Sequence, residues 1–324
     1  MLILVTGLGK IRIFFTSDIH GSDVVFTKFL NAGKFYKANA IIVGGDITGK
    51  MIVPIVELPE GGYKAYYLGS EKIMSSKDDL PQFEKMLYSS GYYGYRTDMA
   101  HMEEFRADPK KIDELFSRLM IERVEKWVKI ADERLHGTNV KCFVQPGNDD
   151  RYEIDEILAH SKSIINPEGS LQQIDGHEMI STGYANMTPW RCPRDISEEE
   201  LEAKIARMAS QLRTPGTAIF CFHVPPYNTL LDPAPVLDEN LRPQIEPGGG
   251  FKMAPAGSLA VRKAIEKYQP LLGLHGHIHE SRSAEKIGRT LCVNPGSEYG
   301  EGVMRGVVIE LEENKVKDYA FTQG

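Results

Sequence analysis

Residues 11–46 read IRIFFTSDIHGSDVVFTKFLNAGKFYKANAIIVGGD, and this stretch decides the fold class. Residues 11–16 are rich in β-forming side chains and predict a buried strand that ends before a polar turn. Apolar residues recur at helical spacing over residues 24–36, and residues 40–43 form a second apolar run that leads to Asp46. A strand, a helix and a second strand in this order predict a βαβ unit in an α/β fold.

A long insertion follows this unit. The next core strand is predicted at residues 141–144, so about ninety residues intervene, far more than a core loop needs. Residues 52–58 and 63–68 predict a hairpin, and residues 111–135 predict a long amphipathic helix. Because open α/β sheets bind ligands at the carboxyl ends of their strands, we expect residues 50–139 to form a cap over a site there. A remote decoration of the core is the alternative.

The second half of the chain continues the α/β pattern. Its Gly- and Pro-rich loop, residues 224–257, is too long for a bare connection and predicts a second wall of the site. The remaining periodic segments predict strands at 171–174, 178–182, 218–222 and 271–274 and helices at 198–212 and 258–268.

Composition limits the functional classes. The chain of 324 residues has 42% hydrophobic and 26% charged residues, as ordinary globular proteins do. Its net charge of -7 gives no footprint for long nucleic acid, and no apolar run approaches the roughly 20 residues that span a bilayer. Residues 1–9 lack a basic start and a cleavage site, so we expect no signal peptide. Four scattered cysteines indicate packing roles in a reducing cytoplasm.

Seven residues of metal-ligand type follow five of these apolar runs. Alone, each has an ordinary interpretation as a turn or a structural residue, but the ordered set favours a metal site. In an extended backbone, the first and third side chains of Asp-x-His and His-x-His could point to the same side. Nitrogen and oxygen ligands without thiolate suit Mn, Fe or Zn. The set is Asp18, His20, Asp46, Asn148, His223, His277 and His279.

In order and extent, this series resembles the signature of the calcineurin-like metallophosphoesterases. The resemblance implies a four-layer αββα sandwich of two mixed β-sheets, with residues 1–324 as one metallophosphoesterase domain and residues 50–139 as its inserted cap. It also implies two metal ions. Asp18, His20, Asp46 and His279 would hold the first, and Asp46, Asn148, His223 and His277 would hold the second, with Asp46 bridging. The turn at 294–297 resembles one in the smaller phosphodiesterase-like members.

The implied chemistry is hydrolysis by an activated water. Two divalent ions, less the charges of Asp18, Asp46 and a bridging hydroxide, leave a positive site that attracts phosphate. Two ions about 3.5 to 4 Å apart would acidify the shared water and stabilise charge during in-line displacement. We therefore expect hydrolysis of a phosphodiester, phosphomonoester or pyrophosphate bond in a phosphorylated small molecule or nucleotide. The alternatives are a non-catalytic interaction protein, a nuclease or a phosphoprotein phosphatase on the same fold.

One position departs from the family pattern. The usual Gly-Asn-His is Gly147-Asn148-Asp149 here, so Asp149 acts as the acid, the role is vacant, or another residue supplies it. Asp149 could donate a proton only if burial or negative neighbours raised its pKa. The next residue, Asp150, is predicted to orient a metal ligand.

Substrate contacts are predicted less directly. Arg151 is a candidate for phosphate contact, and Tyr95, Arg96 and His101 in the insertion could stack on a base or pair with phosphate. Ordinary packing and surface exposure are the alternative for the insertion residues. His275 lies outside the motif and is predicted to be structural or to support a metal ligand.

Overall fold

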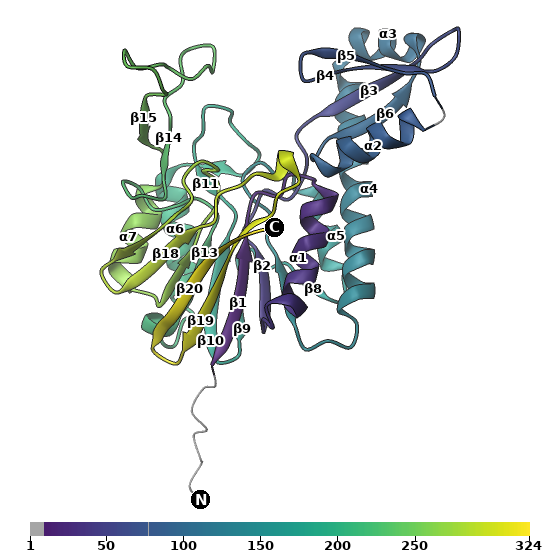
Figure 1. Ribbon diagram of the computed structural model, residues 1–324. Coiled ribbons are helices and arrows are strands. Elements are labelled where there is room, and N and C mark those ends of the chain that lie inside the picture. Colours follow the sequence, from purple (N-terminus) through teal and green to yellow (C-terminus); the bar gives the residue numbers. More distant parts are fainter. Residues whose placement is uncertain (1–9, 77) are drawn as a thin grey trace, which may run out of the picture.

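The computed structural model describes residues 10–76 and 78–324. Within them the protein is a mixed α/β structure built on two six-stranded mixed sheets (Figure 1). Apolar side chains of both sheets form one shared hydrophobic cluster, so the two sheets pack against each other. Residues 1–9, for which the sequence predicts no signal peptide, lie outside the described part of the chain.

The first sheet contains the predicted βαβ unit. Its order is β20-β19-β1-β2-β7-β8, with β1, β2, β7 and β8 parallel and the last two strands of the chain antiparallel. The strands are β1 (Ile11–Thr16), β2 (Ala40–Val43), β7 (Lys141–Val144), β8 (Ile164–Ile165), β19 (Arg305–Glu312) and β20 (Lys315–Gln323).

Side chains of these strands alternate between two hydrophobic layers. Phe14 faces the helices, whereas Ile13 and Phe15 face the second sheet, as the two-residue period of a strand requires. This alternation explains why the core strands are apolar on both faces. The helices that cover the outer face are α1 (Asp23–Phe35), α4 (Pro109–Leu135) and α5 (Glu153–Ala159).

The second sheet has the order β17-β18-β16-β13-β10-β9 and is also mixed. Its outer face is covered by α6 (Glu198–Ala209) and α7 (Leu259–Tyr268). The strands are β9 (Leu171–Ile174), β10 (His177–Thr182), β13 (Ile219–Phe222), β16 (Leu272–Leu274), β17 (Ser283–Ile287) and β18 (Thr290–Asn294).

The insertion forms a sheet of its own. The predicted hairpin is present as β3 and β4, but the sheet has four strands in the order β5-β4-β3-β6, and the aromatic stretch near Tyr95 is strand β6. In Figure 1 this sheet stands apart at one end of the molecule, and α4 returns to the core. The elements are β3 (Ile52–Glu57), β4 (Tyr63–Tyr67), β5 (Ser70–Met74), α2 (Asp79–Ser89), β6 (Tyr93–Thr97) and α3 (Met99–Ala107).

Short elements complete the chain. The long loop at 224–257 carries a two-stranded ribbon that projects from the body in Figure 1. None of the helices in residues 10–76 and 78–324 is long and apolar enough to cross a membrane. The short elements are β11 (Ala185–Asn186), β12 (Asp195–Ile196), η1 (Pro215–Thr217), β14 (Pro233–Pro235), β15 (Met253–Pro255) and η2 (Tyr299–Glu301).

Candidate metal centre

The seven residues of metal-ligand type lie in loops at the carboxyl ends of strands from both sheets. Asp18 and His20 follow β1, Asp46 follows β2, and Asn148 follows β7. The three histidines near the end of the series, His223, His277 and His279, follow β13 and β16. Five of the seven side chains are buried, and His277 and His279 are half-buried. Parallel strands bring their carboxyl ends to one edge, which explains how residues so distant in sequence meet.

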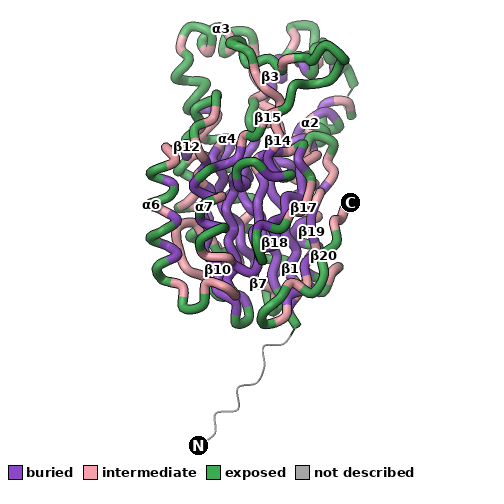
Figure 2. Tube along the Cα trace, turned by 90° about the vertical axis from the view of Figure 1, so that its left-hand side faces the viewer, coloured by how far each residue is buried: buried purple, intermediate pink, exposed green. Residues whose placement is uncertain are grey.

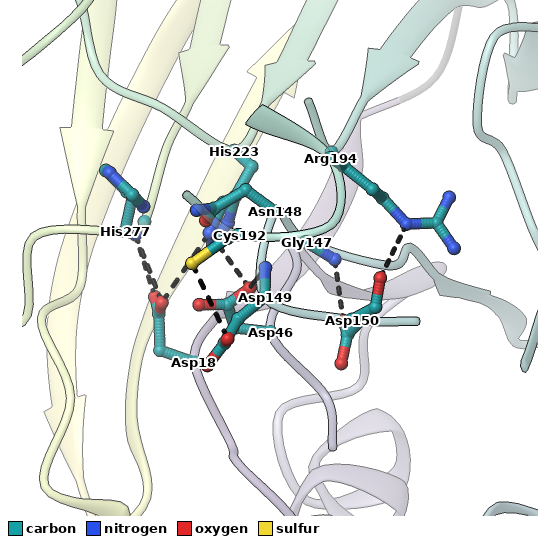
Figure 3. Close-up of polar contacts among 12 residues, drawn as sticks. Asp18, Asp46, Gly147, Asn148, Asp149, Asp150, Cys192, Arg194, His223 and His277 are labelled. Carbon is teal, nitrogen blue, oxygen red and sulfur yellow. Dashed lines mark hydrogen bonds and ion pairs between the residues drawn. The ribbon is translucent and has the colours of Figure 1, made fainter. Parts of the chain in front are cut away.

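These residues form two groups whose side chains could each hold a cation. The first group is Asp18, His20 and His279, and the second is Asp46, His223 and His277. In each group, the candidate ligand atoms lie within 4.8 Å of one another. Figure 3 shows Asp18, Asp46, His223 and His277 gathered together. The grouping agrees with the two ligand sets that the sequence resemblance implies, apart from Asp46 in the first and Asn148 in the second.

Asp46 lies between the two groups. Its Oδ2 atom is 3.7 Å from Nε2 of His20, and its Oδ1 atom is 3.4 Å from Nε2 of His223. Each carboxylate oxygen therefore faces a different group. This is the arrangement that a carboxylate shared between two cations requires.

His223 has a ring nitrogen that is placed to bind a cation. Its Nδ1–H donates to the carbonyl oxygen of Gly44 at 2.9 Å, so the Nε2 lone pair faces Asp46. That buried Nε2 atom has no hydrogen-bond partner among the described residues. Although burial opposes it, the negative charge of Asp46 raises the pKa of His223 to about 9. A proton or a metal ion is needed to separate the lone pair from the carboxylate.

Asn148 presents a second unpaired atom. Its amide Nδ2 donates to Oδ1 of Asp195 at 2.9 Å. Because a carboxylate accepts but does not donate, this contact fixes the amide orientation. The buried Oδ1 atom is left without a partner among the described residues. Oxygen and nitrogen atoms of this kind are suitable ligands for Mn, Fe or Zn.

The backbone at these ligands differs from the sequence prediction. Asp18, His20, Asp46 and His277 have φ angles of 56°, 38°, 50° and 69°, in the left-handed region. The prediction that an extended backbone aims the paired ligands is therefore wrong, because turns aim them. Left-handed backbone costs a non-glycine residue on the order of 1 kcal/mol, and such strain concentrates at functional sites.

Asp150 holds two of the ligand loops together. Its carboxylate accepts from the backbone N–H groups of Ile47 (2.9 Å), Thr48 (2.9 Å) and Gly147 (2.7 Å). It thereby joins the loop after β2, which carries Asp46, to the loop after β7. That Asp150 orients a metal ligand stays a prediction, and its carboxylate bonds the backbone of both ligand loops.

Arg194 is a neighbour of the ligand loops that the sequence does not reveal. It is buried, and its Nε donates to the carbonyl oxygen of Asp150 at 2.9 Å. Its Nη2 donates to Asp155 at 3.0 Å, which balances the buried charge. Figure 3 shows Arg194 and Asp150 to one side of the cluster. Arg194 and Asp195 both bond to the loop that carries Asn148, and both lie in a segment without hydrophobic periodicity.

Asp149 lies beside the cluster and has unusual neighbours. Its backbone N–H donates to Asp46 Oδ1 at 3.0 Å, and its Oδ2 is 3.2 Å from Nζ of Lys50. The Cys192 thiol approaches its Oδ1 at 3.6 Å. Burial and the charge of Asp46 raise the pKa of Asp149, which is the condition for an acid role. Cys192 is half-buried beside Asp149, whereas Cys142, Cys221 and Cys292 are buried packing residues.

The residues predicted to contact substrate pair with other residues of the protein. Arg96 donates two hydrogen bonds to Glu84 (2.6 and 2.7 Å), and His101 pairs with Asp98. The Tyr95 ring packs near Phe105, and Arg151 pairs with Asp113 at 2.5 Å. None of these contacts within the described chain reaches the ligand cluster. His275 donates from Nδ1 to the carbonyl oxygen of Phe222 at 2.9 Å, in keeping with a structural role.

Comparisons with known proteins agree with this architecture. One crystal structure aligns over 97% of this chain and 99% of its own, with 18% identity and a TM-score of 0.58. The crystal structure of TT1561 of Thermus thermophilus aligns over 98% of this chain and 99% of its own, with 15% identity and a TM-score of 0.53. At these identities the likeness shows a shared fold.

A curated relative shows closer kinship. No family model matches the chain. The uncharacterized protein MJ1162 of Methanocaldococcus jannaschii is 31% identical over 177 residues, which cover 54% of this chain and 70% of that protein. The chain therefore belongs to the same protein family as MJ1162 of Methanocaldococcus jannaschii.

Proposed function

We propose that the chain is a metal-dependent phosphoesterase that acts on a phosphodiester, phosphomonoester or pyrophosphate bond of a small molecule or nucleotide. One observation carries the proposal: two adjacent groups of buried and half-buried Asp and His side chains meet at Asp46. The resemblance of the ordered ligand series to the calcineurin-like metallophosphoesterases supports the same reaction class.

The donor set suits two cations. Asp18, His20 and His279 would hold one, Asn148, His223 and His277 the other, and Asp46 would contribute to both. The unpaired buried atoms on Asn148 and His223 support this assignment, because such atoms are costly without a ligand. When bound, two such ions polarise phosphoryl oxygens and lower the pKa of a shared water. Mn, Fe and Zn are the candidates.

The surrounding residues would position this donor set. Asp195 holds the Asn148 amide nitrogen and so would leave the amide oxygen available to a cation, and Asp150 keeps the Asp46 and Asn148 loops together. Asp149, whose pKa is raised by burial and by Asp46, would supply a proton to the leaving group. Each of these roles follows from a contact within the centre.

The proposal extends to the architecture. The paired sheets with helices on their outer faces are interpreted as the four-layer αββα sandwich, residues 1–324 as one domain, and residues 50–139 as a cap beside the centre. The loop at 224–257 would form a second wall. Free thiols at all four cysteines support a cytoplasmic location.

The test is hydrolysis of a chromogenic phosphodiester and the matching monoester by Mn-loaded protein, with Asp46→Asn as the control. Turnover of either ester that Asp46→Asn abolishes supports the proposal. No turnover of either, with two metal ions bound, would sink it and favour an interaction protein on the same fold. Cleavage of a long oligonucleotide or a phosphoprotein in preference to both esters would redirect it to a nuclease or a protein phosphatase.

A further inference from the structure

Lys50 lies where the insertion leaves the core, outside every motif of the sequence. Its Nζ is 3.2 Å from Oδ2 of Asp149, and its side chain is 47% exposed. Among the described residues, it is the one lysine or arginine that is paired with a carboxylate of the metal-capable groups. An ammonium group therefore lies at the open side of an otherwise acidic and imidazole-lined centre.

The loop that carries Lys50 is held at several points. Thr48 donates from its backbone to Asp150 at 2.9 Å, and Gly49 N–H donates to the hydroxyl of Tyr93 at 2.9 Å. A Cβ on Gly49 would lie 2.2 Å from the carbonyl oxygen of Gly91, so only glycine allows this close approach. Asp46 and Lys50 therefore lie on one loop whose backbone is held in place. This fixes the position of the Lys50 backbone relative to Asp46.

Charge explains what Lys50 contributes. Asp149 belongs with His20 and Asp46 to a third cluster whose candidate ligand atoms lie within 4.8 Å of one another. Once it has given up its proton, the Asp149 carboxylate repels an anionic phosphate unless a cation neutralises it. Lys50 supplies this cation, and its partial exposure leaves ammonium N–H groups free to meet an incoming anion.

We propose that the Lys50 ammonium binds the non-bridging phosphoryl oxygens of the substrate, held in place by Asp149. This inference rests on the proposed function, and it adds a substrate-binding residue from the insertion junction. It identifies the edge of the centre next to Asp149 as the entry side for the phosphoryl group.

The test uses inorganic phosphate as the probe. Binding to the Mn-loaded protein is measured by calorimetry for the wild type, Lys50→Gln, Lys50→Arg and the exposed control Lys72→Gln. We expect Lys50→Gln to weaken phosphate binding by about 10- to 100-fold, since a charged hydrogen bond is lost. Lys50→Arg should retain most of the affinity, and Lys72→Gln should match the wild type. Metal content, measured in parallel, should be equal in all four proteins.

Equal phosphate affinity in Lys50→Gln and the wild type would overturn the inference. If Lys50→Gln also had a lower melting temperature, the Lys50–Asp149 ion pair would be structural. In ester hydrolysis, Lys50→Gln should raise KM more for the dianionic monoester than for the monoanionic diester. Failure of the wild type to hydrolyse either ester would reject the proposed function alone, because phosphate titration still decides whether Lys50 binds the anion.

Discussion

The ligand cluster and the insertion hold their polar side chains in opposite ways. In the cluster, Asp18, Asp46 and His223 are buried, and Nε2 of His223 has no partner among the described residues. In the insertion, Arg96 is exposed and already paired with Glu84. Figure 2 shows the same contrast along the chain, with burial concentrated in the body and exposed residues common in the insertion.

Burial and pairing therefore distinguish the two regions. Polar atoms in the cluster lack a partner within the described residues, whereas Arg96 in the insertion already has one. An unpaired buried polar atom lowers the stability of the fold by about 1 to 3 kcal/mol. Such an atom is therefore expected where a bound ligand supplies the missing partner. An exposed ion pair contributes about 0 to 1 kcal/mol and requires no ligand. Residue type alone suggests a site in both regions, whereas burial and pairing support it only in the cluster.

The largest effect is expected at the residue that joins the two groups. Asp46→Asn should lower bound metal per chain and reduce ester hydrolysis by about 1000-fold or more, because several kcal/mol of charge stabilisation are lost. Elemental analysis and chromogenic assays measure both quantities. Asp318→Asn, an exposed carboxamide change in β20, serves as the control. If Asp46→Asn kept the metal content and the rate of the wild type, Asp46 would not join the two groups, and the comparison with the insertion would lose its basis.

A smaller loss is expected behind the cluster. Asp195→Ala removes the acceptor that orients the Asn148 amide, so Mn affinity should fall by about 10- to 100-fold. Calorimetric titration with Mn measures it, with Asp175→Ala in the turn after β9 as the control. If Mn affinity stays within about twofold while unfolding becomes easier, Asp195 braces the fold and does not position a ligand.

The contact between the two regions should affect stability. Tyr93→Phe removes the hydroxyl that accepts the Gly49 N–H, leaving a buried donor unpaired. The free energy of unfolding should fall by about 1 to 3 kcal/mol, measured by urea denaturation. Tyr66→Phe, at an exposed tyrosine, should change nothing. Equal stability of both variants would show that the insertion is not anchored through this hydroxyl.

The smallest effect is expected in the insertion. Arg96→Ala breaks an exposed ion pair, so stability should change by less than about 1 kcal/mol, and KM for either ester should stay at the wild-type value. Glu84→Ala removes the same pair from the other side and is the matched control. A rise in KM for Arg96→Ala alone would place the arginine at the substrate and erase the contrast between the regions.

Local patterns are sufficient to predict the strands that carry the ligands. The strands β1, β2 and β7 begin and end where the apolar runs do, because a buried strand needs a continuous apolar stretch. Ligand types at the ends of such runs predict the cluster, since parallel strands align their carboxyl ends. The left-handed turns at Asp18 and Asp46 have no comparable signal, because Asp is common in turns of every kind.

Residues that act through distant partners escape prediction. Asp195 and Arg194 reach the Asn148 loop from a segment without hydrophobic periodicity, and Lys50 meets Asp149 only when two strand-end loops come together. Aromatic and basic residues recognise nucleotides, and for this reason residue type alone predicts substrate contacts in the insertion, at Tyr95 and its neighbour. The place of this segment in β6, beside β3, is a matter of tertiary pairing that residue type does not encode.

The position of β1 has a consequence for synthesis on the ribosome. Strand β1 pairs on one side with β2, which is made next, and on the other with β19, which begins about 290 residues later at Arg305. During translation, the β19 side of β1 therefore has its native partner only after residues 305–312 have emerged. His277 and His279 follow β16, so both candidate cation-binding groups are complete once residue 279 has been made, before β19 exists.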